Sequence, residues 1–248
     1  MISLLINTIN RYENLDKILE TQSRYNIIDE ILVFNNGKQE IKSYNKVHVI
    51  QATYDVGLRS RWILGALAKN DCLFVQDDDL LVPESIFKML HGHFLFDSSR
   101  LYGIFGREID FTHSYDVNKL IYGEVDLVLT RLACFPKMLI PHILEAEERI
   151  IPHRYPESKA FPHDDILLSF SCLSVFNKKP IAQRYIGIDS VENLSTEGGQ
   201  LHTTKAFMDN RKDIIKKCRQ VLNYGSTIHD FTIPTTAEGS DEVILPPI

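Results

Sequence analysis

The sequence predicts an α/β fold in which a mixed but mostly parallel, Rossmann-like sheet is flanked by helices. Two observations carry this prediction. Short apolar runs alternate with helical patterns over the first 76 residues, as in consecutive βαβ units. Three adjacent carboxylates, Asp77 to Asp79, directly follow one of these runs. Ligands of open α/β sheets bind beyond the carboxyl ends of the strands, so the acidic cluster lies where a site is expected.

The first part of the chain predicts four short strands with helices before the second strand and before the fourth. Apolar runs and helical spacing give a strand at 2–6, a helix at 13–23, strands at 27–34 and 47–50, a helix at 57–68 and a strand at 71–76. Asn35-Asn36-Gly37 is a turn signal that ends the second strand. Right-handed crossovers would bring the polar residues after each strand to one edge of the sheet.

The second part of the chain is less regular. Its patterns predict a helix at 83–96, strands at 101–106 and 125–130, a helix at 137–148, a helix from Asp164 to about Pro180, a strand at 181–185 and a helix at 203–222. The stretch 149–163 carries three prolines and predicts a lid or a wall of a substrate site. We expect one domain over residues 1–232, with 233–248 a loose tail or the start of a linker.

Composition excludes several classes of protein. A formal net charge of −6 argues against non-specific nucleic-acid binding. The four cysteines show no CxxC spacing and lie among apolar residues, which predicts reduced, buried thiols rather than a disulfide frame or a zinc site. No apolar run is long enough to cross a bilayer. The expected location is cytoplasmic, with any work at a membrane done peripherally from that side.

The acidic triplet has two interpretations. Adjacent like charges repel, so the cluster is favoured where a hard divalent cation bridges carboxylate oxygens, as Mg²⁺ does together with substrate phosphates. The alternative is a solvated acidic turn that caps the helix expected after Pro83. The apolar run immediately before Asp77 favours the cation site.

Six motifs occur in a recognisable order. They are INTINR, ILVFNNG, GLRSRW, FVQDDDLLVP, PHDDILLSF and LHTTKAFMDNR. In this order the chain from Met1 to about Leu222 resembles the GT-A glycosyltransferases, most closely exostosin-like and family-two enzymes. The resemblance implies a cytoplasmic transferase of polysaccharide biosynthesis. It would move a sugar from a nucleotide-sugar donor, expected to be a UDP-sugar, to a hydroxyl of a glycan or lipid-linked acceptor, with Mn²⁺ or Mg²⁺ as cofactor.

The resemblance also implies roles for individual residues. The triplet matches the DxD position, where Asp79 would hold the metal and Asp77 would lie nearer the ribose or donor sugar, although either can be the ligand. The remaining residues implied to bind the donor nucleotide are Thr8, Arg11, Asn36, Arg59, Arg61 and Asp78. Guanidinium groups suit phosphate oxygens, which agrees with this assignment.

Four later residues complete the implied site. Asp165, with Asp164 as its helper, would be the general base of an inverting enzyme or would orient the donor and stabilise positive charge in a retaining one. Asp164 can instead be a helix cap. Arg211 would offset charge on the leaving group, or be an ordinary solvated helix residue. His202 would complete the metal site, or be a surface histidine.

Two other functions fit part of the pattern. A sugar nucleotidyltransferase shares the α/β architecture, but it needs a glycine-rich loop after the first strand, and NTINRYEN has no glycine. A non-catalytic module that binds sugar nucleotides or glycans would not need the pair Asp164 and Asp165. Turnover therefore separates the three functions.

Overall fold

The computed structural model describes residues 1–151, 163–185, 191–194 and 205–222. The strands are β1 (Ile2–Thr8), β2 (Ile28–Asn35), β3 (Val47–Gln51), β4 (Cys72–Gln76), β5 (Leu80–Leu81), β6 (Tyr102–Gly103), β7 (Gly106–Arg107), β8 (Gly123–Glu124), β9 (Leu127–Val128), β10 (Leu132–Pro136), β11 (Ile181–Ala182) and β12 (Glu192–Asn193). The helices are α1 (Tyr12–Gln22), the 3-10 helix η1 (Gly57–Arg59), α2 (Ser60–Leu67), α3 (Glu84–Phe96), α4 (Leu139–Ile150), α5 (Asp164–Phe176) and α6 (Lys205–Val221).

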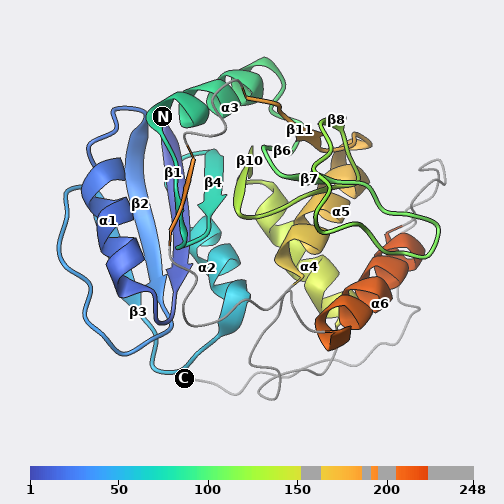
Figure 1. The fold of residues 1–248 in the computed structure, drawn as a ribbon, viewed down its shortest axis with the longest axis horizontal. Coiled ribbons are helices and arrows are strands. Elements are labelled where there is room, and N and C mark those ends of the chain that lie inside the picture. The colour runs from blue at the N-terminus through green and yellow to red at the C-terminus, as the bar shows by residue number, and fades with distance from the viewer. Residues whose placement is uncertain (152–162, 186–190, 195–204, 223–248) are drawn as a thin grey trace, which may run out of the picture.

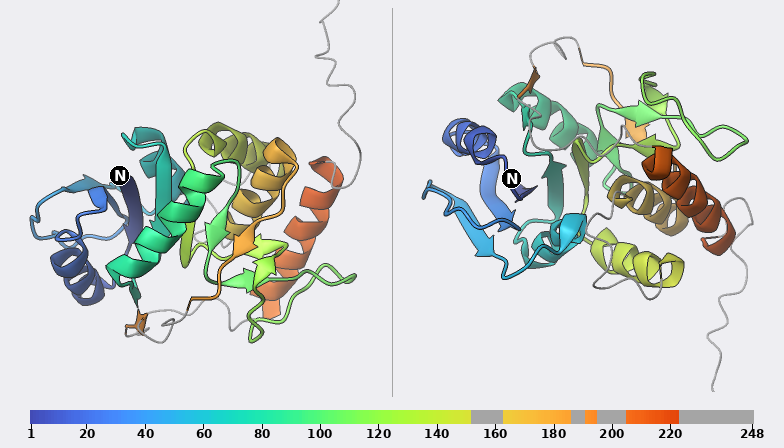
Figure 2. Two further views of the ribbon diagram at one scale, coloured as in Figure 1. Left: turned by 90° about the horizontal axis from the view of Figure 1, so that it is seen from above. Right: turned by 60° about the horizontal axis from the view of Figure 1, so that its bottom comes forward.

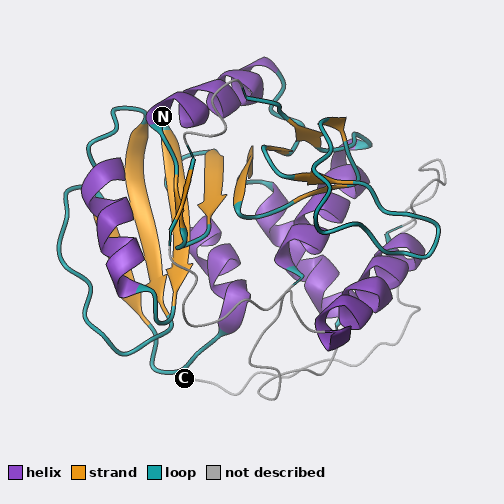
Figure 3. Cartoon of the chain, in the orientation of Figure 1, coloured by secondary structure: helices purple, strands orange, loops and turns teal. Residues whose placement is uncertain are grey.

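An eight-stranded sheet runs through the molecule in the order β3-β2-β1-β4-β10-β6-β11-β8 (Figures 1 and 3). The strands β3, β2, β1 and β4 are mutually parallel, with Leu5 opposite both Leu32 and Val75. Strand β10 is antiparallel to its neighbours β4 and β6. The carboxyl ends of the parallel strands therefore share one edge, as the sequence predicts.

The central strand β1 separates two hydrophobic cores. Side chains alternate between the faces of a strand, so Leu5 points to one core and Leu4 and Ile6 point to the other. The core on the Leu4 side includes apolar residues of α1 and α3. The core on the Leu5 side includes residues of α2, α4, α5 and α6. Burial on both faces explains why β1 is a continuous apolar run.

Helices α4, α5 and α6 lie against one another beyond β10 (Figure 2). The first turn of α5 begins at Asp164, and both Asp164 and Asp165 are buried. Burial of two adjacent carboxylates is costly unless cations pair with them, and it marks this helix start as the second place to seek a site.

The predicted strands and helices of the first 76 residues are confirmed, except that the helix expected at 57–68 begins with the short 3-10 turn η1. Gly57 has a φ of 65°, which suits glycine because side chains disfavour this region. In the second part, the predicted strand 125–130 is wrong in position. Only Leu127–Val128 is a strand there, and β10 at 132–136 pairs with β4 instead.

Two more strand predictions were too long. The run 101–106 contains the separate short strands β6 and β7, and the run 181–185 contains only β11. Two-residue strands carry no alternation that a sequence pattern could show. The predicted helices 137–148 and 203–222 are confirmed with shifted ends, and the helix from Asp164 ends at Phe176, before Pro180, with Asn177 in the left-handed region.

All four cysteines are free and buried, and their reduced state stays a prediction. Trp62 is fully buried against Phe135. Among the described helices, none has the length and apolar composition that a membrane span requires.

Candidate functional site

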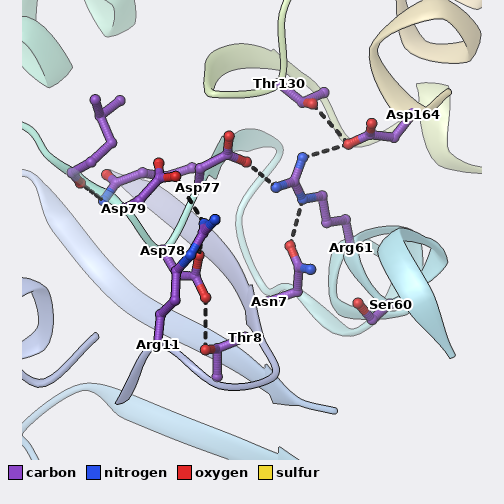
Figure 4. A network of polar contacts seen from close by, with 12 residues as sticks. Asn7, Thr8, Arg11, Ser60, Arg61, Asp77, Asp78, Asp79, Thr130 and Asp164 are labelled. Carbon is purple, nitrogen blue, oxygen red and sulfur yellow. Dashed lines mark hydrogen bonds and ion pairs between the residues drawn. The ribbon is translucent and has the colours of Figure 1, made fainter. Parts of the chain in front are cut away.

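The acidic triplet Asp77 to Asp79 lies between β4 and β5, at the carboxyl end of the parallel strand β4 (Figure 4). The backbone N–H of Asp77 donates to the carbonyl of Arg131, at 3.1 Å, which fixes the turn against the residue before β10. The three side chains do not share one partner, and each has a distinct environment.

Asp78 is held by the last residue of β1 and by a residue of the loop that follows it. Thr8 Oγ1 donates to Asp78 Oδ2 at 2.7 Å, and Arg11 Nη1 donates to Asp78 Oδ1 at 2.9 Å. Burial raises the pKa of Asp78 and outweighs Thr8 and Arg11, which lower it. Thr8 and Arg11, predicted to bind the donor, therefore meet the triplet directly. Asp78 serves to anchor this edge of the site, since both of its oxygens accept from the protein.

Asp79 is the residue of the triplet that has a carboxylate oxygen available to bind a cation. Its Oδ2 accepts from Arg11 Nη1 at 2.8 Å, while its Oδ1 is buried and has no hydrogen-bond partner in the described part of the chain. Burial raises the pKa of Asp79, and the neighbouring charge of Asp77 raises it further. A buried carboxylate oxygen without a donor is costly. A hard divalent cation would satisfy it, so Asp79 fits the predicted role of metal ligand.

Arg61 joins the triplet to the start of α5. Its Nε donates to Asn7 Oδ1 at 2.7 Å, its Nη1 pairs with Asp164 and its Nη2 pairs with Asp77 (Figure 4). The residue is only 2% exposed. Burial alone lowers the pKa of Arg61, but Asp164 and Asp77 outweigh it and the pKa is raised. All three nitrogens are thus directed at protein groups rather than at the space of a donor phosphate.

Two residues of this network were missed by sequence reasoning. Thr130 Oγ1 donates to Asp164 Oδ2 at 2.8 Å, and Asn7 accepts from Arg61. Thr130 precedes β10, and its role was hidden because that strand was misplaced. Asn7 stands beside Thr8 in the INTINR motif, so the motif itself was the available signal.

Asp165 faces the last described helix. Arg211 of α6 donates from Nη2 to Asp165 Oδ2 at 2.6 Å, and both side chains are buried. The Arg211 guanidinium carbon lies 5.3 Å from the ring centre of Tyr115. Burial raises the pKa of Tyr115 to about 12, and the charge of Asp165 contributes to the rise. The predicted partners Asp165 and Arg211 are therefore brought together, although α5 and α6 are separated by a long stretch of chain.

The other predicted donor contacts lie at the margin of this network. Asn36 accepts from the Val56 N–H at 3.0 Å and donates weakly to Ser60, so it supports the turn that leads into α2. Arg59 pairs with Glu147 of α4, at 3.2 Å. His202 lies outside the described residues.

The described residues contain no ready-made cage of three or more His, Cys, Asp or Glu side chains for a metal ion. Mg²⁺ and Mn²⁺ do not require such a cage, because they are commonly held by one or two carboxylates, water and substrate phosphates. The donor set offered by Asp79 and Asp77 fits that pattern. The structure shows a carboxylate triplet after β4 and a carboxylate pair at the start of α5, joined through the guanidinium of Arg61.

Comparison with known proteins gives a likeness in structure only. No family model matches the sequence, and no curated protein matches it. Among solved structures, a mannosyltransferase from Pyrobaculum calidifontis in complex with GDP-Man and Mn²⁺ superposes with a TM-score of 0.54 and 12% sequence identity. The match covers 79% of this chain and 58% of that one, so this chain spans less than two thirds of the length of the mannosyltransferase. The chain therefore has a GT-A-like α/β fold, with a mostly parallel sheet between layers of helices.

Proposed function

We propose that the protein is a metal-dependent glycosyltransferase that moves a sugar from a nucleoside diphosphate donor to a hydroxyl of a glycan or lipid-linked acceptor. The observation that carries the proposal is the Arg61 bridge, which fixes Asp77, beside the candidate metal ligand Asp79, relative to Asp164. A glycosyl transfer needs both groups in one place, since charge develops on the departing diphosphate while a proton leaves the acceptor hydroxyl. The GT-A-like fold supports the proposal.

The roles of the residues follow from their positions. A divalent cation held by Asp79 and Asp77 would neutralise the departing diphosphate. Thr8 and Arg11 hold Asp78 and thereby fix the loop that carries both ligands. Arg11 also touches Asp79, so it would share that carboxylate with the cation or turn toward a phosphate.

On the other side, Asp165 is the carboxylate that acts on the sugar or on the acceptor proton, and Arg211 orients it. Asp164 holds Arg61 and Thr130, which makes it a support for Asp165 and the first turn of α5. Whether the reaction inverts or retains configuration is set by which face of the sugar Asp165 meets. A UDP-sugar is the donor expected from the sequence, and the GDP-Man complex of the mannosyltransferase makes guanosine donors equally worth testing.

The test is turnover of purified full-length protein with a panel of UDP- and GDP-sugars, Mn²⁺ and simple glycoside acceptors. We expect release of nucleoside diphosphate that is abolished by chelator and reduced at least about a hundredfold by Asp79→Asn and by Asp165→Asn. Asp213→Asn is the matched control, since its carboxylate is more than half exposed and forms an ion pair with Lys217 of the same helix.

Other products would redirect the assignment. Release of pyrophosphate would indicate nucleotidyl transfer. Donor binding with no turnover for any acceptor, unchanged by Asp165→Asn, would indicate a binding module.

A further inference from the structure

Two arginines of the site form no ion pair with any carboxylate that the structure describes. Other arginines of the chain form ion pairs with Asp or Glu: Arg11, Arg24, Arg59, Arg61, Arg100, Arg149 and Arg211. For Arg107 and Arg131, in contrast, no Asp or Glu of the described ranges lies within ion-pair distance. An arginine without a counter-ion is unremarkable on the surface, but Arg107 is buried.

Arg107 is 7% exposed and lies in β7. Its Nη1 donates to its neighbour Gly106 O at 2.9 Å, and its Nη2 donates to Val117 O at 2.9 Å. Its Nε is buried and has no acceptor among the described residues. Carbonyl oxygens satisfy two donors but leave the positive charge without compensation.

Arg131 precedes β10 and is half-buried. Its guanidinium carbon lies 4.8 Å from the ring centre of Phe105, and its Nη2 donates to Asn193 Oδ1 at 2.6 Å. The ring and the amide hold the group in place but carry no negative charge. Arg131 is therefore a second oriented cation that forms no ion pair with the described Asp and Glu residues.

Phe105 brings the two arginines near each other, because the Arg131 guanidinium packs over the Phe105 ring and Phe105 precedes Arg107 by two residues. Burial lowers the pKa of Arg107, and Arg131 lowers it further, while Tyr115 and Asp165 act in the opposite direction. At the other side, Arg131 is among the cations that oppose the burial-driven rise in the pKa of Asp79. The charge of Asp165 thus acts on Arg107, and the Arg131 carbonyl accepts from the Asp77 N–H at 3.1 Å, which places Arg131 beside the acidic triplet.

We propose that Arg107 and Arg131 form an anion subsite that binds an acidic group, a carboxylate or a phosphate, carried by one of the two sugar substrates. Two neighbouring cations that form no direct ion pair with a described carboxylate repel each other, and an anion between them would remove that cost. Guanidinium groups recognise both kinds of anion through paired N–H donors. The subsite rests on the proposed function for its place beside the transferred sugar, but the anion binding itself can be measured without turnover.

Binding is measured first by calorimetry, with UDP-glucuronate, UDP-glucose and UDP as probes. If the acid belongs to the donor, wild type binds UDP-glucuronate more tightly than UDP-glucose, and Arg131→Gln lowers that preference about tenfold or more. If the acid belongs to the acceptor, wild type binds methyl glucuronide or a glycosyl phosphate more tightly than methyl glucoside when UDP is present. The same preference then appears in the ratio of the kcat/KM values of these acceptors.

The variants are chosen so that loss of folding cannot imitate the result. Arg131→Gln alters a half-buried residue, Arg107→Lys keeps the charge and should keep part of the preference, and Arg107→Met removes it. Arg24→Gln is the control, because its side chain is 75% exposed and pairs with Glu20 of α1 on the surface. Circular dichroism verifies that each variant is folded.

Two results would overturn the subsite. One is equal binding and transfer of acidic and neutral substrates by wild type. The other is a loss of affinity for UDP itself as large as the loss for the acidic probes, which would make Arg107 and Arg131 diphosphate contacts. A lack of turnover with every substrate pair would count against the proposed function only, since the acid preference in calorimetry would still stand.

Discussion

We expect a large loss of folding stability when the guanidinium of Arg61 is removed. Comparison with a double variant can assign part of that loss to the pair with Asp164. Arg61 is buried, and its partner Asp164 has a side chain only 7% exposed, whereas that of Asp77 is 26% exposed. In Arg61→Met, Asp77 can turn toward water, but Asp164 keeps only Thr130 as a neutral donor. Breaking a buried pair by removing one partner costs about 3–5 kcal/mol, so we expect a loss of free energy of unfolding in that range.

The assay is urea unfolding of wild type, Arg61→Met, Asp164→Asn and the double variant. Asn at 164 can still accept from Thr130 and leaves no unpaired charge. The double variant should therefore be more stable than the sum of the single effects predicts, by about 2 kcal/mol. Additivity within about 0.5 kcal/mol would show that Arg61 and Asp164 do not interact and would refute the bridge.

The pH dependence of the same variants gives a second check. Burial raises the pKa of Asp164 above its ordinary value of 3.8, and Arg61 opposes that rise. A carboxylate with a raised folded-state pKa contributes stability that is present below its unfolded pKa and is lost as pH rises through its folded pKa. Without Arg61 the rise is larger, so Arg61→Met should lose more stability relative to wild type at about pH 8 than at about pH 5. A pH-independent difference would contradict the assignment.

Three further predictions concern the rest of the fold. Gly106→Ala should lower the free energy of unfolding by about 1–3 kcal/mol, because a Cβ would lie 2.3 Å from the backbone oxygen of Ile121. Gly92→Ala should raise it by about 0.5–1 kcal/mol, because a Cβ at this position of α3 meets open space. Urea unfolding measures both changes. A thiol reagent at about pH 8 should modify none of the four buried cysteines before denaturation and all of them afterwards; fast labelling of the native protein would contradict the burial. Ser99, with Lys178, lowers the pKa of Asp97 below 3.8, so Asp97→Asn should melt earlier than wild type near pH 7, with the difference shrinking as the pH falls below 3.8; a constant difference would refute the pairing.

Local pattern was sufficient for the parallel half of the sheet. The strands β1, β2 and β4 are largely buried on both faces and appear in the sequence as mostly apolar runs, and polar residues mark where each ends. The same logic failed at β10. Its five residues follow Thr130-Arg131 without a turn signal, and the preceding apolar run at 125–130 looked equally strand-like. Only pairing with β4 distinguishes the two runs, and pairing is a long-range property.

In the candidate site, too, the sequence identified some features and only the structure showed the others. Residue type identified the members of each acidic cluster, because carboxylates beside apolar runs are unusual enough to see in one dimension. The partners of these carboxylates were less visible. Arg61 was expected at the nucleotide, yet its three nitrogens are directed at Asn7, Asp77 and Asp164. The expected donor-binding and metal roles remain predictions for the assays above.

The sequence alone determined that this chain forms an α/β fold with an acidic turn at the end of β4 and a second acidic pair at a helix start. These features follow from local hydrophobic period and residue chemistry. The tertiary structure decided that both acidic clusters meet through Arg61. It also decided that Arg107 and Arg131 form no ion pair with the carboxylates of the described residues, and that Arg107 Nε is buried without an acceptor there. Those facts depend on which segments the folded sheet brings together and on which charges it buries. Both are long-range properties that local sequence patterns do not reveal.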